Sequence, residues 1–350
     1  ERLEGKQNYR RQNIDGVEFV WIRTSPYYKG NDWRRVVNML SYSFRVIRLA
    51  RRIKERPDVI LASSPHPFAG LAGWLLAKIK RARFVFEVRD LWPQTLVEIG
   101  GYSNKSFVVK LLRVLEKFLY RRARKIVVLL PKASDYITGL GIPSNKIVYI
   151  PNGVSPELFS DSGAELPEDF ADLIARLKSE EKVLVGYTGA HGTADALSTV
   201  IEAAKFVQEK GSDKVYFLLV GDGPEKQKLL RKAESWGLKN IDFHKPIPKY
   251  AMPALLRAIE VTVVCLKKSV LFKYGLSKNK VFDYMASAKS IVWAIDSVNN
   301  PVAEANCGIT VPPEDAEEMA KAIIKLCDLS DRERHEMGMR GYEYVMKYHS

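Results

Sequence analysis

The sequence predicts an α/β protein made of two doubly wound, Rossmann-like parallel-sheet domains. Short apolar runs rich in β-branched residues alternate with longer segments of helical periodicity, which is typical of parallel sheets covered by helices on both faces. The same alternation resumes after a turn-rich stretch at 151–169. A length of 350 residues is enough for two domains of ordinary size.

The expected strands follow one another in both halves at similar spacing. In the first half they lie at 17–22, 58–63, 84–88, 125–130 and 146–150. In the second half they lie at 182–189, 214–223, 241–244, 260–266, 290–295 and 308–313. Because ligands of doubly wound sheets bind beyond the carboxyl ends of the strands, the loops after these strands form the candidate active surface.

The stretch PNGVSPELFSDSGAELPED, at 151–169, marks the expected boundary between the domains. Its Pro, Gly and Asp residues favour turns over helix or strand. We therefore predict an N-terminal domain at 1–155, a C-terminal domain at 170–328 and a C-terminal helix at 329–350.

Positive charge is concentrated in the first half of the chain. Lys and Arg exceed Asp and Glu by 17 in residues 1–150, whereas the remainder carries −3 of the total of +14. Such asymmetry indicates that one domain meets nucleic acid, an anionic membrane surface or a phosphate-bearing substrate. No apolar run approaches the ~18 residues of a transmembrane helix. The three cysteines lack metal-site spacing and are expected to be buried thiols in a reducing compartment.

Two glycine-containing loops in the second half suit phosphate binding. YTGAHG places Gly189 and Gly192 at a strand-to-helix turn, where backbone N–H groups favour an anion. GDGPEK places Gly221 in a second such loop, with Pro224 expected at the first position of the next helix. Glycines that serve only tight turns remain the alternative. No P-loop, H-E-x-x-H or D-x-D pattern occurs, so no metal ion is expected.

The segment GLSKNKVFDYMASAK reads as a helix that begins with lysines. Cations are unfavourable at a helix N-terminus unless an anion lies in front of it. We therefore expect Lys280, with Asn279 and the helix N-terminus, to hold a diphosphate. Asp283, one turn further on, can accept hydrogen bonds from ribose hydroxyls. A solvated basic turn is the alternative.

In the first half, FVFEVRDLWPQ carries Glu87, Arg89 and Asp90 at the end of an expected strand. Asp90 can act as a base or orient an acceptor hydroxyl, and Arg89 can contact a phosphate. An Arg–Asp salt bridge that organises the loop is the alternative. His66 lies in a neighbouring loop, either as an acceptor contact or as a structural histidine.

Two segments, 32–54 and 105–125, are basic and amphipathic helices by periodicity. Such helices can lie in a membrane interface beside anionic lipids. For 32–54 we favour the membrane; for 105–125 a helix packed on the core with a solvated basic face is equally open. The expected membrane contacts are Trp33, Arg34, Arg35, Arg45 and Arg48.

Several motifs together resemble the bacterial family 4 glycosyltransferases, which are retaining, metal-independent enzymes of the GT-B fold. The resemblance covers nearly the whole chain and is strongest to the subgroup that builds O-antigens and capsules from UDP-activated N-acetylated amino sugars such as N-acetyl-fucosamine. It rests on FEVRDLWPQ, KIVVLLPKASDYITGLGIPSNKIVYIPNGVSPELF, YTGAHGTADALSTVIEAAK, LLVGDGPEKQKL, PKYAMPALLRAIEVTVVCLK and LSKNKVFDYMASAKSIV.

The resemblance implies two Rossmann-like domains that face a cleft, with the donor on the C-terminal domain and the acceptor on the N-terminal one. It implies donor contacts at Gly189, His191, Gly192, Gly221, Lys245, Pro246, Asn279, Lys280 and Asp283. It implies acceptor contacts at His66, Glu87, Arg89 and Asp90, with Asp90, Arg89 and Lys280 in catalysis.

This sequence also departs from the family pattern. Gly275 stands where the first acidic residue of the family's C-terminal pair is expected, and Lys278 replaces a proline. Ala190 and His191 stand where an Arg…Lys diphosphate pair is expected, so His191 and Lys280 are expected to take over. A first strand, its Gly-rich loop and a helix are expected before residue 1.

The resulting prediction is a retaining hexosyltransferase that moves an N-acetylated amino sugar from UDP to a polyprenyl-diphosphate-linked saccharide in lipopolysaccharide or capsule synthesis. No cofactor is expected. The protein is expected in the cytoplasm, bound peripherally to the inner face of the cytoplasmic membrane. One rival is a UDP-sugar 2-epimerase of the same fold, for which Asp90 and Asp283 are too few carboxylates. The other is a nucleic-acid-binding protein, disfavoured because the aromatic residues of the basic helices recur at apolar-face positions.

Overall fold

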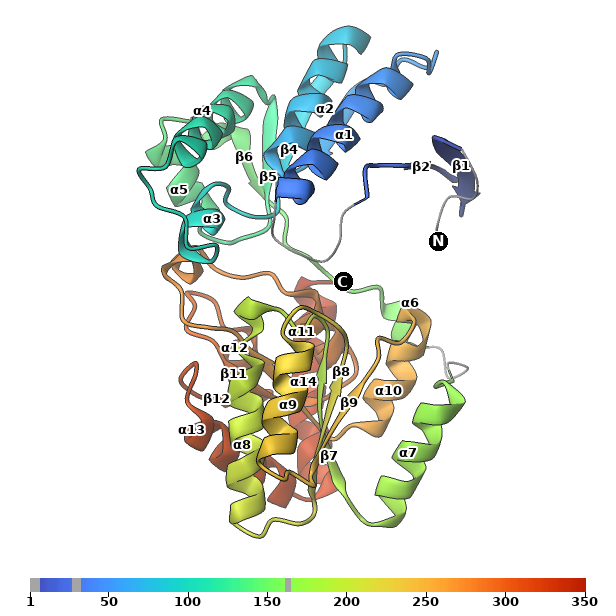
Figure 1. Cartoon of the computed structure of the whole chain (residues 1–350), viewed down its shortest axis with the longest axis vertical. Coiled ribbons are helices and arrows are strands. Elements are labelled where there is room, and N and C mark those ends of the chain that lie inside the picture. The colour runs from blue at the N-terminus through green and yellow to red at the C-terminus, as the bar shows by residue number, and fades with distance from the viewer. Residues whose placement is uncertain (1–6, 27–32, 161–164) are drawn as a thin grey trace. The chain divides into compact units, whose positions relative to one another are not determined.

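The computed structural model describes residues 7–26, 33–160 and 165–350, and the chain divides into two units, Glu1–Ile150 and Pro151–Ser350 (Figure 1). Ile150 directly precedes the turn-rich stretch at 151–169. Each unit has a parallel sheet of its own.

The first unit contains an antiparallel hairpin and a four-stranded parallel sheet of order β3-β4-β5-β6. Helix α2 packs on β3 and β4, and α1 and α4 pack on α2. The elements are β1 (Tyr9–Ile14), β2 (Val17–Ile22), α1 (Trp33–Ala50), β3 (Val59–Ser63), α2 (Pro67–Lys80), β4 (Arg83–Val88), α3 (Gln94–Glu98), α4 (Phe107–Arg122), β5 (Lys125–Val128), α5 (Ala133–Gly139), η1 (Ser144–Lys146) and β6 (Ile147–Tyr149).

The strand at 17–22 corrects the sequence prediction, because it does not join the parallel sheet. It pairs antiparallel with β1, with Tyr9 opposite Ile22. The connection is Asp15–Gly16, and both residues have positive φ values, 51° and 82°. An Asp-Gly pair between two strands is the preferred two-residue hairpin turn, because its twist matches that of the strands. The preference of Asp-Gly for a hairpin turn therefore outweighed the strand–helix alternation, which had predicted a parallel strand at 17–22.

The second unit contains a six-stranded parallel sheet of order β12-β11-β10-β7-β8-β9. Its elements are α6 (Pro156–Ser160), α7 (Glu168–Ser179), β7 (Val183–Thr188), η2 (Thr193–Asp195), α8 (Leu197–Glu209), β8 (Val215–Val220), α9 (Lys226–Ser235), β9 (Ile241–His244), η3 (Lys249–Ala251), α10 (Met252–Ala258), β10 (Val261–Cys265), η4 (Val270–Tyr274), α11 (Asn279–Ala286), β11 (Ser290–Ala294), α12 (Pro301–Glu304), β12 (Gly308–Thr310), α13 (Ala316–Asp328) and α14 (Asp331–Tyr348).

Helices cover both faces of this sheet, as the continuous apolar strands predict. Successive residues of one strand point to opposite faces. Leu184 joins a core with α7, α10 and α11, whereas Val185 joins a core with α8, α9 and α13. All three cysteines are buried, as expected. Helix α9 begins at Lys226, so Pro224 is not at its first position.

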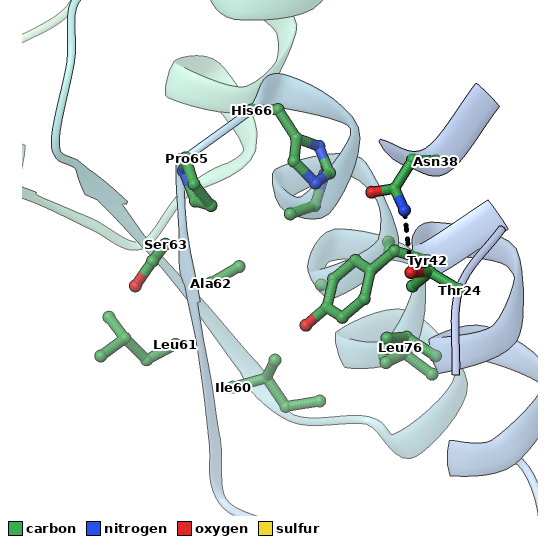
Figure 2. A pocket seen from close by; sticks show the side chains of 14 residues that line it. Thr24, Asn38, Tyr42, Ile60, Leu61, Ala62, Ser63, Pro65, His66 and Leu76 are labelled. Atoms are coloured by element: carbon green, nitrogen blue, oxygen red, sulfur yellow. Dashed lines mark hydrogen bonds between the residues drawn. The ribbon is translucent and has the colours of Figure 1, made fainter. Parts of the chain in front are cut away.

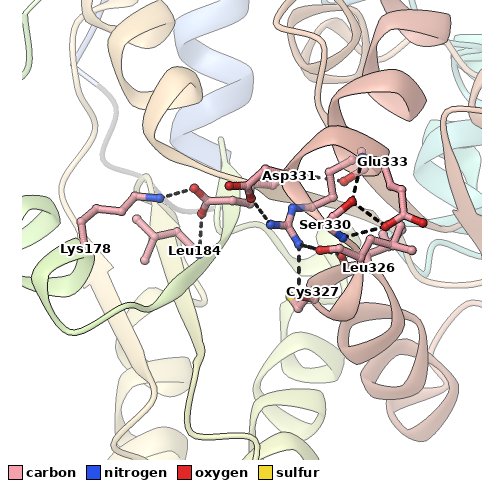
Figure 3. Close-up of polar contacts among 11 residues, drawn as sticks. Lys178, Leu184, Leu326, Cys327, Ser330, Asp331 and Glu333 are labelled. Carbon is pink, nitrogen blue, oxygen red and sulfur yellow. Dashed lines mark hydrogen bonds and ion pairs between the residues drawn. The ribbon is translucent and has the colours of Figure 1, made fainter.

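Polar side chains hold the end of α13 and the start of β7 in the second unit (Figure 3). Arg334 of α14 donates to the carbonyl oxygens of Leu326 and Cys327, at 3.2 and 3.1 Å, and so satisfies carbonyls at the end of α13. The Glu260 carboxylate accepts from the Leu184 N–H at 2.7 Å and pairs with Lys178. These contacts join α14 to α13, and they join α7 and β7 through Glu260.

Candidate active site

The two predicted glycine loops of the second unit lie against each other at the carboxyl edge of neighbouring strands β7 and β8. The Gly189 N–H donates to Val220 O at 2.9 Å, and the His191 N–H donates to Asp222 O at 3.0 Å. Gly221 has φ 155°, and a Cβ there would lie 1.8 Å from the Gly189 carbonyl oxygen. Only glycine fits where the two loops meet at Gly189 and Gly221, and we call this place the glycine crossing.

Lys280 extends from the first turn of α11 to this glycine crossing. Its Nζ donates to the Tyr187 hydroxyl at 2.5 Å and lies 3.8 Å from the centre of the Tyr187 ring. Asp195 Oδ1 is 3.8 Å away, and a Cβ at Gly189 would be 2.9 Å from Nζ. Burial lowers the pKa of Lys280 to about 8, against the opposing effect of Asp195. The ammonium is therefore a partly desolvated cation beside the two glycine loops.

Helix α11 begins at Asn279, as the sequence predicts, and Lys278 at its N-cap makes no side-chain capping bond. The helix is tied to β7 because the Tyr284 hydroxyl accepts from the Thr188 N–H at 2.8 Å. The loop before the helix is held by Asn152, whose side chain donates to Ser277 O at 2.7 Å. Anion binding at such a helix start is favoured by its free N–H groups.

The predicted ribose and base contacts lie on α11 and on the loop after β9. Asp283 pairs with Lys249 Nζ at 2.7 Å. Lys245 and Pro246 are exposed, and Lys245 pairs with Asp169 at 3.1 Å, which holds the pKa of the Asp169 carboxyl below its usual range. The structure thus brings Lys249 to the predicted ribose carboxylate, whereas Lys245 pairs with Asp169 in the first turn of α7.

His191 is fully buried between the two glycine loops. Neither ring nitrogen has a hydrogen-bond partner in the described part of the chain. Burial, aided by the charge of Lys226, lowers its pKa to about 4, so the ring is neutral at pH 7. A neutral imidazole can offer a hydrogen bond to a phosphoryl group but no positive charge. His191 and Lys280 were expected to replace the family's Arg…Lys pair. Of these two, only Lys280 can therefore be a cation at pH 7.

The predicted acceptor residues of the first unit lie at the carboxyl ends of the neighbouring strands β3 and β4, with Glu87 in β4 itself and the others in the loops that follow. The Ser63 hydroxyl donates to the Glu87 carboxylate, and the Arg89 N–H donates to the Ser64 hydroxyl at 3.1 Å. Arg89 and Asp90 are exposed at this edge. The loop after β4 thus exposes one cationic and one carboxylate side chain. Its start is held to the loop after β3 by the hydrogen bond between Arg89 and Ser64.

His66 caps α2 and also lines a cavity. Its Nδ1 accepts from the Ala69 N–H at 3.2 Å, and burial beside Arg35 lowers its pKa to about 4. The cavity, about 510 Å³, lies among α1, α2 and β3, and Figure 2 shows His66 and Tyr42 at it, with Asn38 bonded to Thr24. A structural role as a helix cap is thus established for His66.

A buried carboxyl that the sequence did not single out lies beneath Asp90. Glu116 of α4 accepts hydrogen bonds from the hydroxyls of Tyr120 at 3.0 Å and Tyr136 at 3.1 Å. Burial raises its pKa to about 8, despite these bonds. Glu116 and Asp90 line the same small cavity, together with Trp92. The sequence offered no signal, since Glu116 is one charge among many in a basic helix.

Helix α1 exposes a row of apolar side chains, which are Trp33, Val36, Val37, Leu40 and Phe44. Of the predicted membrane contacts, the Arg34 guanidinium lies 5.9 Å from the centre of the Trp33 ring. Arg34 and Arg48 are exposed, while Arg35 and Arg45 are half-buried. No helix in the described part of the chain is both long and apolar enough to span a membrane. No cluster of three metal-ligating side chains occurs among the described residues.

The chain matches two protein families. Residues 3–153 match the family described as a glycosyl transferase 4-like domain, and residues 182–328 match glycosyl transferases group 1. It is 25% identical over 277 residues to a putative colanic acid biosynthesis glycosyl transferase, WcaI, of Escherichia coli, covering 76% of this chain and 65% of the relative. It is 23% identical over 287 residues to a probable glycosyltransferase, WbjE, of Pseudomonas aeruginosa, covering 81% and 69%. The chain thus spans just under two thirds of the length of WcaI.

Solved structures resemble the fold at low sequence identity. HepE of Anabaena in complex with UDP and glucose aligns with a TM-score of 0.67 and 16% identity, over 92% of this chain and 80% of that one. Sucrose-phosphate synthase of Thermosynechococcus elongatus aligns with a TM-score of 0.73 and 17% identity, over 99% and 82%. With the two parallel-sheet units, these likenesses confirm the predicted GT-B fold class.

Proposed function

We propose that this chain, which combines a glycosyl transferase 4-like domain with a glycosyl transferases group 1 domain, is a glycosyltransferase with a UDP-sugar donor. The observation that carries the proposal is the partly desolvated Lys280 ammonium beside the glycine crossing and the start of α11. The complexes of HepE with UDP-glucose and with UDP and glucose support the donor class.

The proposed reaction moves an N-acetylated amino sugar to a polyprenyl-diphosphate-linked saccharide with retention. Lys280 and the N–H groups of α11 would stabilise the negative charge that develops on the departing diphosphate. Held in place by Tyr187 and Asp195, this cation needs little reorganisation during the reaction, and it would supply charge that a metal ion supplies elsewhere. Asp283 would contact the ribose.

In the first unit, Asp90 would orient or deprotonate the acceptor hydroxyl, and Arg89 would contact the acceptor's phosphate. Helix α1 would lie on the anionic inner face of the cytoplasmic membrane, with Trp33 and Phe44 toward the lipid. The relative WcaI, a putative colanic acid biosynthesis glycosyl transferase, supports a role in polysaccharide synthesis.

A direct test is to incubate the protein and excess chelator with UDP-N-acetylated amino sugars and a polyprenyl-diphosphate-linked saccharide. We expect a mass gain of one sugar on the acceptor, with release of UDP and the anomeric configuration retained by NMR. Asp90→Asn should abolish transfer but leave UDP binding intact. Release of UDP without a glycosylated product, for every donor and acceptor tried, would count against the acceptor class.

A further inference from the structure

Two asparagines hold the residues that come just before helix α11. Leu276 donates its N–H to Asn299 Oδ1 at 2.8 Å, and its carbonyl oxygen accepts from Asn299 Nδ2 at 3.0 Å. The Ser277 hydroxyl accepts from the Asn152 N–H at 2.9 Å, and the Ser277 carbonyl oxygen accepts from Asn152 Nδ2 at 2.7 Å. We call this set of four hydrogen bonds the asparagine clamp.

The two asparagines of the clamp come from separate segments of the second unit. Asn152 lies in the turn-rich stretch, directly after the boundary between Ile150 and Pro151. Asn299 lies in the loop after β11. They are 125 and 23 positions away from the residues that they hold. No local pattern in the sequence could therefore connect either asparagine with α11.

The segment 275–278 needs such side-chain partners because it belongs to no helix or strand. It starts at Gly275, which has φ 94° and ψ −178°, a conformation that only glycine adopts without strain. This conformation gives a backbone reason for glycine at the position where the resemblance expected an acidic residue. The segment ends at Lys278, which is extended, with φ −94° and ψ 117°.

The asparagine clamp and Tyr284 hold α11 at different points. The Tyr284 hydroxyl accepts from the Thr188 N–H at 2.8 Å and ties the later part of the helix to β7. Helix α11 has only eight residues, so a single tie would let its first turn tilt. Lys280 lies in that first turn, beside the N–H groups that have no partner within the helix. The clamp therefore sets the direction in which these groups and Lys280 point.

His349 holds Asn152 from the other side. Its Nδ1 donates to Asn152 O at 3.1 Å, and its ring stacks on Phe282 of α11 with 4.2 Å between the ring centres. The Val154 N–H donates to His349 O at 2.8 Å, and a Cβ at Gly153 would lie 2.4 Å from the same oxygen. The main chain at 152–154 is thus packed between α11 and the end of α14, which leaves the Asn152 side chain little freedom.

We propose that Asn152 and Asn299 are positioning residues for donor binding, which orient the first turn of α11 and Lys280 toward the donor diphosphate. The proposal rests on the proposed function and adds residues that act through Lys280. Groups held in place bind a charged ligand without reorganising, so a loosened first turn should cost diphosphate affinity. The expected base contact Lys245 lies on another loop, and the expected ribose contact Asp283 is next to the anchored Tyr284, so both should stay in place.

The test compares UDP with uridine in titrations of the whole protein in excess chelator. Asn152→Ala and Asn299→Ala should each weaken UDP binding about fivefold, and the double variant about 25-fold, as expected for loss of hydrogen bonds that hold one element. Uridine lacks the diphosphate, so its affinity should change less than about twofold. General loosening of the unit would weaken both ligands alike, so the ratio of the two affinities separates positioning from a merely structural role.

Asn300→Ala is the matched control for these variants. Asn300 is next to Asn299 and is also half-buried, but its side chain accepts from the Ala303 N–H at 3.0 Å and caps α12. This variant should bind UDP like the unmodified protein. At the clamp itself, Ser277→Thr keeps the hydroxyl that accepts from Asn152 and should bind UDP more tightly than Ser277→Ala.

Hydrogen exchange reads the asparagine clamp without any ligand. In the double variant the backbone amides of α11 should exchange faster, whereas those of β7 and α8 should stay as protected as in the unmodified protein. Unchanged UDP affinity in the double variant, or equal losses for UDP and uridine, would overturn the positioning role and leave the proposed donor intact. Absence of UDP binding by the unmodified protein would overturn the proposed function, and this proposal with it.

Discussion

The two units use their apolar surface differently. In the second unit, helices cover both faces of the sheet and the apolar residues form two buried cores. In the first unit, apolar side chains of the edge strand β3, of α1 and of α4 remain exposed, among them Leu61, Trp33 and Phe107. The first unit also carries the net positive charge of the chain. The difference teaches that the second unit buries its apolar residues beneath its candidate ligand loops, whereas the first unit leaves apolar and basic side chains together at its surface.

The largest expected effect is a loss of stability in the second unit alone. Gly221→Ala places a methyl group 1.8 Å from the Gly189 carbonyl oxygen at a positive φ, and should lower the free energy of unfolding by about 3 kcal/mol or more. Gly237→Ala, also at positive φ but with open space around its Cβ, should cost only about 1 kcal/mol. Hydrogen exchange read separately over 1–150 and 151–350 checks this. Equal losses from both variants would show that the glycine loops are not in close contact.

The next effect concerns the buried carboxyl of the first unit. Glu116 keeps its proton to about pH 8 in the folded unit, against about 4.5 for the unperturbed group. Its stabilising contribution is therefore complete below about pH 4.5 and is lost as the pH rises through 8. Glu116→Gln cannot ionise, so at pH 8.5 the variant should be more stable than the unmodified protein by up to about 5 kcal/mol. Denaturant unfolding at pH 4.5 and 8.5 measures it; a difference that does not change with pH would contradict the assigned pKa.

A third prediction sharpens the role of the second unit. Because burial lowers the pKa of Lys280 to about 8, its ammonium discharges above that pH and UDP affinity should fall by up to tenfold per pH unit. Lys280→Arg should flatten this dependence between pH 7 and 9, since a guanidinium stays charged. Calorimetric titrations across this range decide it, and identical profiles for both proteins would remove Lys280 from the diphosphate site.

The smallest expected effect is on the residue that positions Lys280. Tyr187→Phe keeps the ring under the ammonium but removes the 2.5 Å hydrogen bond, and should weaken UDP binding about fivefold. Tyr216→Phe removes another tyrosine hydroxyl of the second unit, one bonded to Asp242 at 3.0 Å, and should leave UDP affinity unchanged. Equal effects from the two variants would indicate general loosening of the unit instead of a positioning role.

Most of the fold could be predicted from local patterns of apolar residues in the sequence. The apolar runs at 58–63 and 214–223 became strands of parallel sheets, and the helices expected at 32–54 and 105–125 formed. The errors were also local. The Asp15–Gly16 pair signalled a hairpin that the wider alternation obscured, and Pro224 lies in a turn before α9.

The candidate site was only partly accessible from the sequence. Gly189, Gly221 and Lys280 stand in recognisable contexts, and the structure brings them together. Tyr187 was missed because its partner Lys280 lies 93 positions away, and nothing local distinguishes it from a core aromatic residue. Periodicity reports which face of an element is apolar, but not which polar groups meet across the sheet.

The most direct test of the account is calorimetric titration of UDP into the protein in excess chelator. We predict binding that the chelator does not change and that Lys280→Ala weakens about 100-fold, as expected for loss of a charge-assisted contact. Lys289→Ala is the matched control, because burial lowers the pKa of Lys289 to about 8 as well, and its side chain donates to Arg257 O instead; it should bind UDP normally. UDP binding that requires a metal ion, or that survives Lys280→Ala unchanged, would contradict the assignment of the donor diphosphate to Lys280.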